Sequence, residues 1–216
     1  MEASMDKQTF ITVVAAAAIL ALAACSGSPK AGAIETKAGA ETKKEPPTPP
    51  DPVAAQTAFY EMYKPARIWA PDLLPLSLTS NELPSLKNEG GKAAMWTAVF
   101  VSPSRREART YFYSVVNEGE SVSKGVTARG AQHWSGPTPK SRPFQTTGFL
   151  VDSDAAYKTA YTKAEAWVKK HPDKAAAMWL GSTAKLPSPV WLVIWGTAKS
   201  GYAVYVDATT GIADPK

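Results

Sequence analysis

The sequence predicts an α+β fold made of two related halves, residues 53–150 and 151–216, each with one helix and an antiparallel sheet. Each of two amphipathic helical patterns is followed by short apolar stretches with turn residues between them. The segments Trp96–Phe100 and Trp191–Trp195 share an aromatic–x₃–aromatic spacing at the same stage of each half. Loops of different length prevent an end-to-end alignment, so this spacing and the order of elements indicate the repeat.

The first half begins with a helical pattern at Val53–Trp69, where Pro65 is expected to limit the helix. Strands at Met95–Val101 and Thr110–Val116 are predicted to form a hairpin around a Ser-Pro-Ser-Arg turn. A further strand is predicted at Gly125–Trp134. Three prolines after it indicate a long connection to the second half.

The second half begins with a clearer helix, Asp154–Lys170, which has one apolar stripe and whose start is marked by three possible N-cap residues in a row, Asp152, Ser153 and Asp154. It is predicted to end at His171, because a residue that precedes proline avoids helical angles. The strands predicted for this half are Ala175–Leu180, Trp191–Trp195 and Tyr202–Val206.

The second half resembles a PepSY-type domain, a small module of one helix and an antiparallel sheet found in bacterial exported proteins and peptidase propeptides. The resemblance rests on the helix Asp154–Lys170, on Pro189–Gly196, and on the ending Gly201–Gly211, which contains V-D-A-x-T-G. It implies a non-catalytic module in the periplasm or at the cell surface. Within that ending, Asp207 is expected to cap backbone N–H groups of a turn rather than to act in catalysis.

The N-terminal part contains an almost unbroken apolar run at Phe10–Ala24. A helix needs about 20 residues to cross a bilayer, so this run is too short and suits the core of a secretory signal. Small residues follow the run, where a signal peptidase cuts. The sequence therefore predicts export.

The run ends in Leu22-Ala23-Ala24-Cys25, which resembles a bacterial lipobox. The resemblance implies that Leu22, Ala23 and Ala24 are recognised by the peptidase and that 1–24 is removed as a signal peptide. It further implies that Cys25 carries fatty acyl chains of the palmitate type, which anchor the protein in membrane lipid.

Two questions stay open at this end of the chain. The alternative to lipidation is that Cys25 is an ordinary free cysteine near a cleavage site, and translation starts either at Met1 or at Met5. Ser26 after the cleavage site favours, by resemblance to Gram-negative lipoproteins, the outer membrane facing the periplasm.

Residues 25–52 combine the lipidated cysteine with a linker rich in Pro, Ala, Lys and Glu, which lacks aromatic side chains. Such a composition buries too little apolar surface to offset the entropy of ordering, so we expect a disordered tether. A Pro-rich ligand for the groove of a partner is the alternative.

The overall composition excludes several functions. A net charge of +5 without any run of five like charges does not indicate nucleic-acid binding. One cysteine and two histidines cannot supply a Cys/His zinc cage, and no cofactor motif occurs, so neither metal nor cofactor is expected.

The remaining candidates have plain structural explanations. His133 and His171 lack a spacing partner for metal binding or base catalysis and are expected to be structural. Arg105, Arg106 and Arg109 form a basic group that is expected to be a solvated hairpin end, although an acidic partner or anionic headgroups would suit it. The tryptophans are expected to lie in the core, and an aromatic groove requires two or three of them to be exposed together.

These observations predict a membrane-anchored lipoprotein of the cell envelope, with a non-enzymatic α+β module that engages a peptide or an envelope protein. A surface-attached hydrolase with an unrecognised serine or carboxylate site is one alternative. A purely structural envelope protein is the other.

Overall fold

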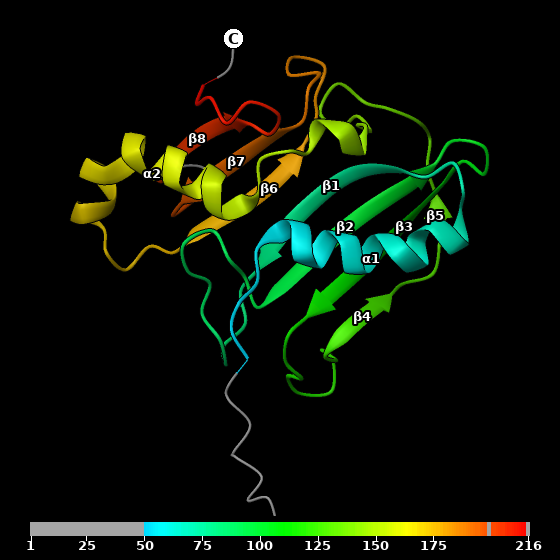
Figure 1. The fold of residues 1–216 in the computed structure, drawn as a ribbon, viewed down its shortest axis with the longest axis horizontal. Helices are drawn as coiled ribbons and strands as arrows, with labels where there is room; N and C mark the ends of the chain where they lie inside the picture. Colours follow the sequence, from blue (N-terminus) through cyan, green and yellow to red (C-terminus); the bar gives the residue numbers. More distant parts are fainter. Residues whose placement is uncertain (1–49, 198–199, 215–216) are drawn as a thin grey trace, which may run out of the picture. The chain divides into compact units, whose positions relative to one another are not determined.

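The computed structural model describes residues 50–197 and 200–214 and confirms the α+β class. Two helices accompany one antiparallel sheet of eight strands in the order β4-β3-β2-β1-β6-β7-β8, with β5 paired to β3 (Figure 1). The elements are α1 Ala55–Trp69, β1 Leu74–Asn81, β2 Met95–Ser102, β3 Glu107–Ser114, β4 Gly125–Ala128, β5 Gln132–His133, a 3₁₀ turn at Thr146–Gly148, α2 Ser153–Lys170, β6 Ala176–Gly181, β7 Val190–Trp195 and β8 Tyr202–Asp207.

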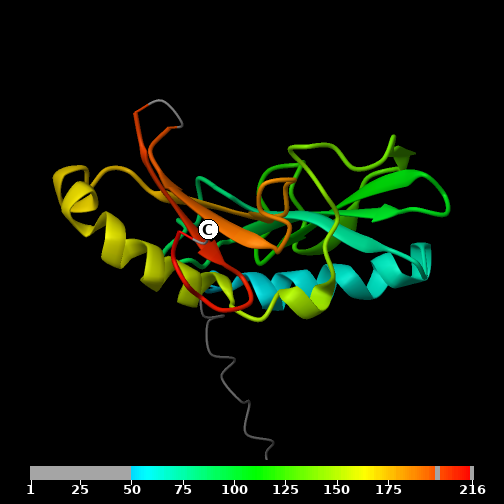
Figure 2. The same cartoon turned by 90° about the horizontal axis from the view of Figure 1, so that it is seen from above.

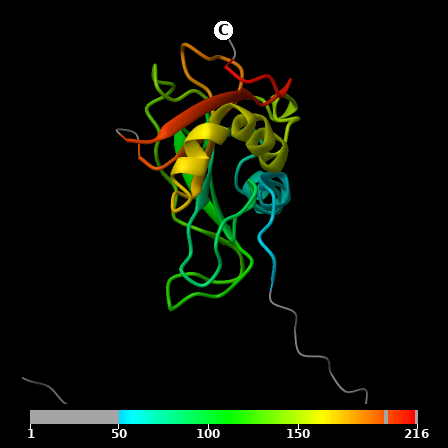
Figure 3. The ribbon, with the colours of Figure 1, turned by 90° about the vertical axis from the view of Figure 1, so that its left-hand side faces the viewer.

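Both helices pack on the same face of the sheet, α1 against β1–β3 and α2 against β7 and β8. The view from above shows this layering, with α1 and α2 along one side of the strands (Figure 2). The side view shows α1 set to one side of the green strands (Figure 3). The core lies between these layers, and its largest fully buried side chains include Trp96, Trp191 and Trp195.

Two strand predictions need correction. No strand was expected at β1, yet it lies in the middle of the sheet and pairs with both β2 and β6. Its Pro75, next to a shift in register, and its polar residues obscure the usual apolar pattern. The strand expected at Gly125–Trp134 is interrupted and forms β4 and β5, which pair with different parts of β3.

The first helix also differs from its prediction, because α1 continues through Pro65 to Trp69. Proline removes one N–H donor from a helix interior. Ala66, immediately after it, is fully buried against the core, so packing holds the last turn in place.

The two halves repeat the same arrangement of helix and strands. The Trp96 indole N–H donates to the Val53 carbonyl at 3.0 Å, and the Trp191 indole N–H donates to the Val151 carbonyl at 2.9 Å. Each acceptor lies two residues before its helix. The aromatic–x₃–aromatic spacing predicted from the sequence therefore marks equivalent positions of β2 and β7.

The helices repeat with an offset of 98 residues, which places fully buried side chains at matching positions. The pairs of buried positions are Ala55 and Ser153, Ala58 and Ala156, Met62 and Ala160, and Ala66 and Ala164. Stacked aromatic rings match as well, with centroids 5.7 Å apart for Phe59 and Tyr63 and 5.9 Å apart for Tyr157 and Tyr161.

The turn after β8 has the structure that the sequence predicts. The Asp207 Oδ1 atom accepts hydrogen bonds from the N–H groups of Thr209 and Thr210, each at 2.8 Å. Gly211 has a φ of +76°, which few other residues adopt readily. The carboxylate of Asp207 therefore ends the strand.

Candidate binding groove

The face of the sheet opposite the helices carries one continuous row of directly paired residues. Strand pairing joins each member to the next across seven strands. The row consists of Thr127, Phe112, Thr97, Thr79, Trp179, Leu192 and Tyr205. Alternation along each strand places these side chains away from the helices, because most of their neighbours along the strands belong to the core.

An apolar groove of about 880 Å³ lies at the Tyr205 end of this row. Its floor consists of Trp179, Leu192 and Tyr205, from β6, β7 and β8. Tyr205 is 40% exposed, and the other two are partly exposed. The volume falls within the range of about 300–1,000 Å³ that is usual for ligand sites.

Two loops form the wall of the groove, and hydrogen bonds hold them to each other. The Ala184 N–H donates to the Pro139 carbonyl at 2.9 Å, and the Arg142 N–H donates to the Ser182 carbonyl at 3.0 Å. These loops add Leu186 to the apolar lining. The wall is therefore built in advance rather than assembled around a ligand.

The Trp179 ring lies over Gly181, two residues further along the same strand. A Cβ atom at position 181 would collide with the outer part of that ring. Glycine therefore allows the indole to lie along the sheet and to present a ring to the groove. Such a ring can stack on an aromatic, proline or sugar ring.

The internal repeat offers a direct test of whether the fold needs this apolar floor. Strand pairing makes Thr79 equivalent to Trp179, and Thr97 equivalent to Leu192. On the core face, by contrast, both halves have large aromatic residues at the positions of Trp96 and Trp191. The first half thus forms the same strands with hydroxyl side chains where the second half has the groove, so packing does not require Trp179 and Leu192.

A second pocket, of about 360 Å³, lies at the other end of the row. Phe112 and Thr127 contribute to its lining, together with Arg129. The Arg129 guanidinium carbon lies 5.2 Å from the centroid of the Phe112 ring, in a cation–π arrangement. An aromatic ring with a cation beside it therefore marks this end of the row.

The edges of the sheet offer less room for a peptide strand than its open face. The Asp214 N–H donates to the Tyr205 carbonyl at 2.7 Å, and the Asp207 N–H donates to the Ile212 carbonyl at 2.9 Å. The chain after β8 thus covers part of that edge. At the opposite edge, β4 is four residues long.

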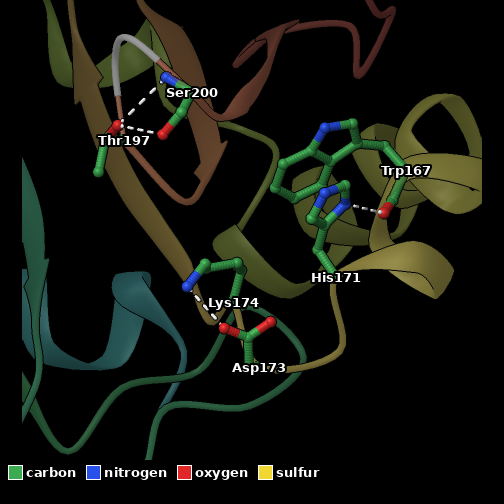
Figure 4. Close-up of polar contacts among 6 residues, drawn as sticks. All are labelled: Trp167, His171, Asp173, Lys174, Thr197 and Ser200. Atoms are coloured by element: carbon green, nitrogen blue, oxygen red, sulfur yellow. Dashed lines mark hydrogen bonds and ion pairs between the residues drawn. The ribbon is translucent and has the colours of Figure 1, made fainter.

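The two histidines are not brought together. His133 is exposed in β5. The His171 ring is stacked on the Trp167 ring with centroids 4.0 Å apart, and its Nδ1 lies 2.8 Å from the Trp167 carbonyl. Figure 4 shows the His171 ring directed at Trp167. The same view shows a separate contact, between the hydroxyl groups of Ser200 and Thr197.

The three arginines singled out in the sequence lie apart from the groove. The Arg105 guanidinium is 6.0 Å from the Trp69 ring centroid, and the Arg109 guanidinium is 5.3 Å from that of Tyr111. Arg106 lies in the turn with a φ of +53°. Their side chains thus contact separate parts of the surface near the β2–β3 hairpin.

The expectation that Trp179 lies in the core is wrong. Trp96, Trp191 and Trp195 are buried, whereas Trp179 lies on the uncovered face. The alternation of β6 contained the signal, because Met178 and Leu180 on either side belong to the core. No comparable pattern pointed to Lys140 and Lys185, which line the groove from loops.

Among residues 50–197 and 200–214, no three His, Cys, Asp or Glu side chains lie close enough together to hold a metal ion. In the same part of the chain, no helix is both long and apolar enough to span a membrane. The lipobox residues Leu22, Ala23, Ala24 and Cys25, and residues 26–49 of the linker, lie outside the described residues.

Comparison of the chain with protein-family models found no matching family, and searches of curated proteins and of solved structures found no similar protein.

Proposed function

We propose that this protein is an exported lipoprotein, anchored through Cys25, whose α+β body is a non-catalytic binding module of the cell envelope. The observation that carries the binding role is the groove of Trp179, Leu192 and Tyr205 on the uncovered face of the sheet. In its first half the fold has threonines at the positions equivalent to Trp179 and Leu192, so we attribute these two apolar side chains to the binding of a partner.

The resemblance of the second half to PepSY-type modules supports a non-catalytic role outside the cytosol. The ligand that suits the groove is a segment of peptide or protein. Trp179 supplies a ring for stacking, and the neighbouring leucine and tyrosine bury an apolar side chain.

Localisation is tested by the intact mass of the protein extracted from membranes, compared with a Cys25→Ser variant. We expect the mature chain to begin at residue 25 and to carry acyl mass, and the variant to lose its membrane attachment. A wild-type mass without acyl chains, or a variant that stays equally bound to membranes, would contradict the anchor.

Binding is tested by selecting peptides from a random displayed library on the wild-type protein. The double variant Trp179→Thr/Leu192→Thr places in the groove the residue type that the first half has at the equivalent positions. We expect selected peptides to bind this variant at least about tenfold more weakly, since central aromatic and apolar contacts dominate such interfaces.

The matched control is Tyr60→Thr/Ile68→Thr. It removes two exposed apolar side chains from α1, the helix that covers the opposite face of the sheet from the groove. Selected peptides should bind this control as they bind the wild type, and urea unfolding should show that both variants are folded. A library that yields no peptide, or peptides that bind the groove variant with undiminished affinity, would overturn the binding role.

A further inference from the structure

Positively charged side chains lie at both ends of the row on the uncovered face. Lys140 and Lys185 line the groove, and Arg129 lines the second pocket. Within the described part of the chain, no carboxylate lies within ion-pair distance of these three cations. Each end therefore offers positive charge to a ligand.

The strand residues of this face include a single carboxylate. Strand pairing places Asp207 on the same face as Leu192 and Tyr205. Its Oδ1 atom already accepts two backbone hydrogen bonds in the turn after β8. The other strand residues of this face are uncharged, so an anionic ligand meets little repulsion there.

The middle of the row is polar. Thr97 and Thr79 separate the two pockets, and the Thr97 hydroxyl donates to the Asn81 side-chain oxygen at 2.6 Å. From Phe112 to Tyr205 the row crosses five inter-strand intervals, which amounts to about 24 Å at about 4.8 Å each. An extended peptide of about seven residues has the same length, at about 3.3–3.6 Å per residue.

We propose that the ligand of this face is an acidic, extended peptide segment of about seven residues that lies across the strands. This inference rests on the proposed function and specifies its ligand. An apolar or aromatic side chain enters the groove over Trp179, and acidic side chains at the two ends meet Lys140 and Lys185 on one side and Arg129 on the other. The hydroxyl groups between them face the peptide backbone.

The test uses a palindromic heptapeptide, so that either chain direction gives the same contacts. It has glutamate at both ends, phenylalanine next to each glutamate, Ser-Thr-Ser in the middle, and blocked termini. Its neutral counterpart has glutamine in place of both glutamates. Binding is measured by calorimetry to the mature, membrane-extracted chain in nanodiscs of phosphatidylcholine, which avoid detergent in the groove and carry no net charge.

We expect the glutamate peptide to bind about tenfold more tightly than the glutamine peptide in 50 mM salt, and this advantage to shrink in 300 mM salt. The variant Lys140→Gln/Lys185→Gln should lower the affinity for the glutamate peptide and leave that for the glutamine peptide nearly unchanged. The matched control, Lys158→Gln/Lys170→Gln, removes two exposed lysines from α2 and should change neither affinity.

If the two peptides bind with equal affinity and both lose binding to Trp179→Thr/Leu192→Thr, the proposal of an acidic ligand is overturned, while the groove is still a binding site. Absence of binding by either heptapeptide would overturn the extended peptide, while the library selection separately decides whether the groove binds peptides at all. Binding of an acidic polysaccharide such as polygalacturonate, without binding of the glutamate peptide, would show that the ligand is not a peptide.

Discussion

The Asp72 carboxylate joins the chain before β1 to the turn between β2 and β3. Its Oδ2 accepts a hydrogen bond from the Ser104 N–H at 2.9 Å, and its Oδ1 accepts one from the Ser102 hydroxyl at 2.7 Å. These bonds, the backbone bond foremost, lower the pKa of Asp72 from 3.8 to about 2. Hydrogen bonds to a carboxylate favour its charged form, which is why the pKa falls.

A lowered pKa predicts how stability depends on pH. The contribution of Asp72 is present above its unfolded-state pKa of 3.8 and is lost as the pH falls toward about 2. We expect Asp72→Asn to lower the free energy of unfolding at pH 7 by about 1 kcal/mol at most, since the group is well exposed to solvent. Urea unfolding of both proteins at several pH values should show this difference vanish near pH 2. A difference that stays constant across this range would contradict the assignment.

Single residues were predictable from the sequence where their partners are local. Asp207 caps a turn two and three residues ahead, and its role followed from the type and order of residues there. The partners of Asp72 lie some 30 residues away, and only the folded sheet brings them to it. The same reason explains why the lysines of the groove were not foreseen.

The N-terminus of α1 is capped by Asp152 and Ser153, at the N-terminal end of α2. Ala54, at the N-cap position of α1, makes no side-chain capping hydrogen bond. Instead the Ala55 N–H donates to the Ser153 hydroxyl at 2.8 Å, and the Gln56 N–H donates to the Asp152 carboxylate at 2.9 Å. The sequence marked these two residues as caps for their own helix, and the repeat brings them to the other helix as well.

Removal of the buried hydroxyl should therefore destabilise the protein through α1. We expect Ser153→Ala to lower the free energy of unfolding by about 1–2 kcal/mol, because the Ala55 N–H loses its acceptor in a buried place. Alanine suits the first turn of α2, so that helix should not be weakened. Denaturant titration measures the loss, and Ser188→Ala, at an exposed loop position, is the control. A loss equal to that of the control would show that the hydroxyl does not cap α1.

Elements with strong apolar periodicity were predictable, whereas β1 was not. It is enclosed between β2 and β6, so it gains stability from pairing on both sides rather than from the pattern of its own residues. Its Leu78 is fully buried, but serine, threonine and asparagine occupy many neighbouring positions. Leu74, Leu76 and Leu78 do alternate along the strand, but Pro75 and the polar residues after Leu78 give the stretch the composition of a loop.

At the scale of the whole molecule, the two halves are joined more closely than a sequence repeat suggests. The described residues form one compact unit, and the central pairing of β1 with β6 makes one sheet of the two sets of strands. Side chains cross the same boundary: the Trp96 and Trp191 rings lie 6.3 Å apart, and the Phe149 and Trp191 rings 5.7 Å apart. The aromatic spacing identified the repeat, but it carried no information about which strands meet.

This shared core predicts that the second half does not fold alone. A fragment of residues 151–216 would expose the edge of β6 and one side of Trp191, both of which the first half covers. A chain of that length buries only about 60% of its surface even when its core is complete, less than a domain of the full length does. We expect circular dichroism and urea titration to show no cooperative unfolding for this fragment, and a cooperative transition for residues 50–216. Mixing the fragment with residues 50–150 should restore the transition, because pairing of β1 with β6 completes the sheet. A cooperative transition in the isolated fragment would contradict this prediction. It would mean that the core of the second half is sufficient for folding and that the pairing of β1 with β6 only joins two independent domains.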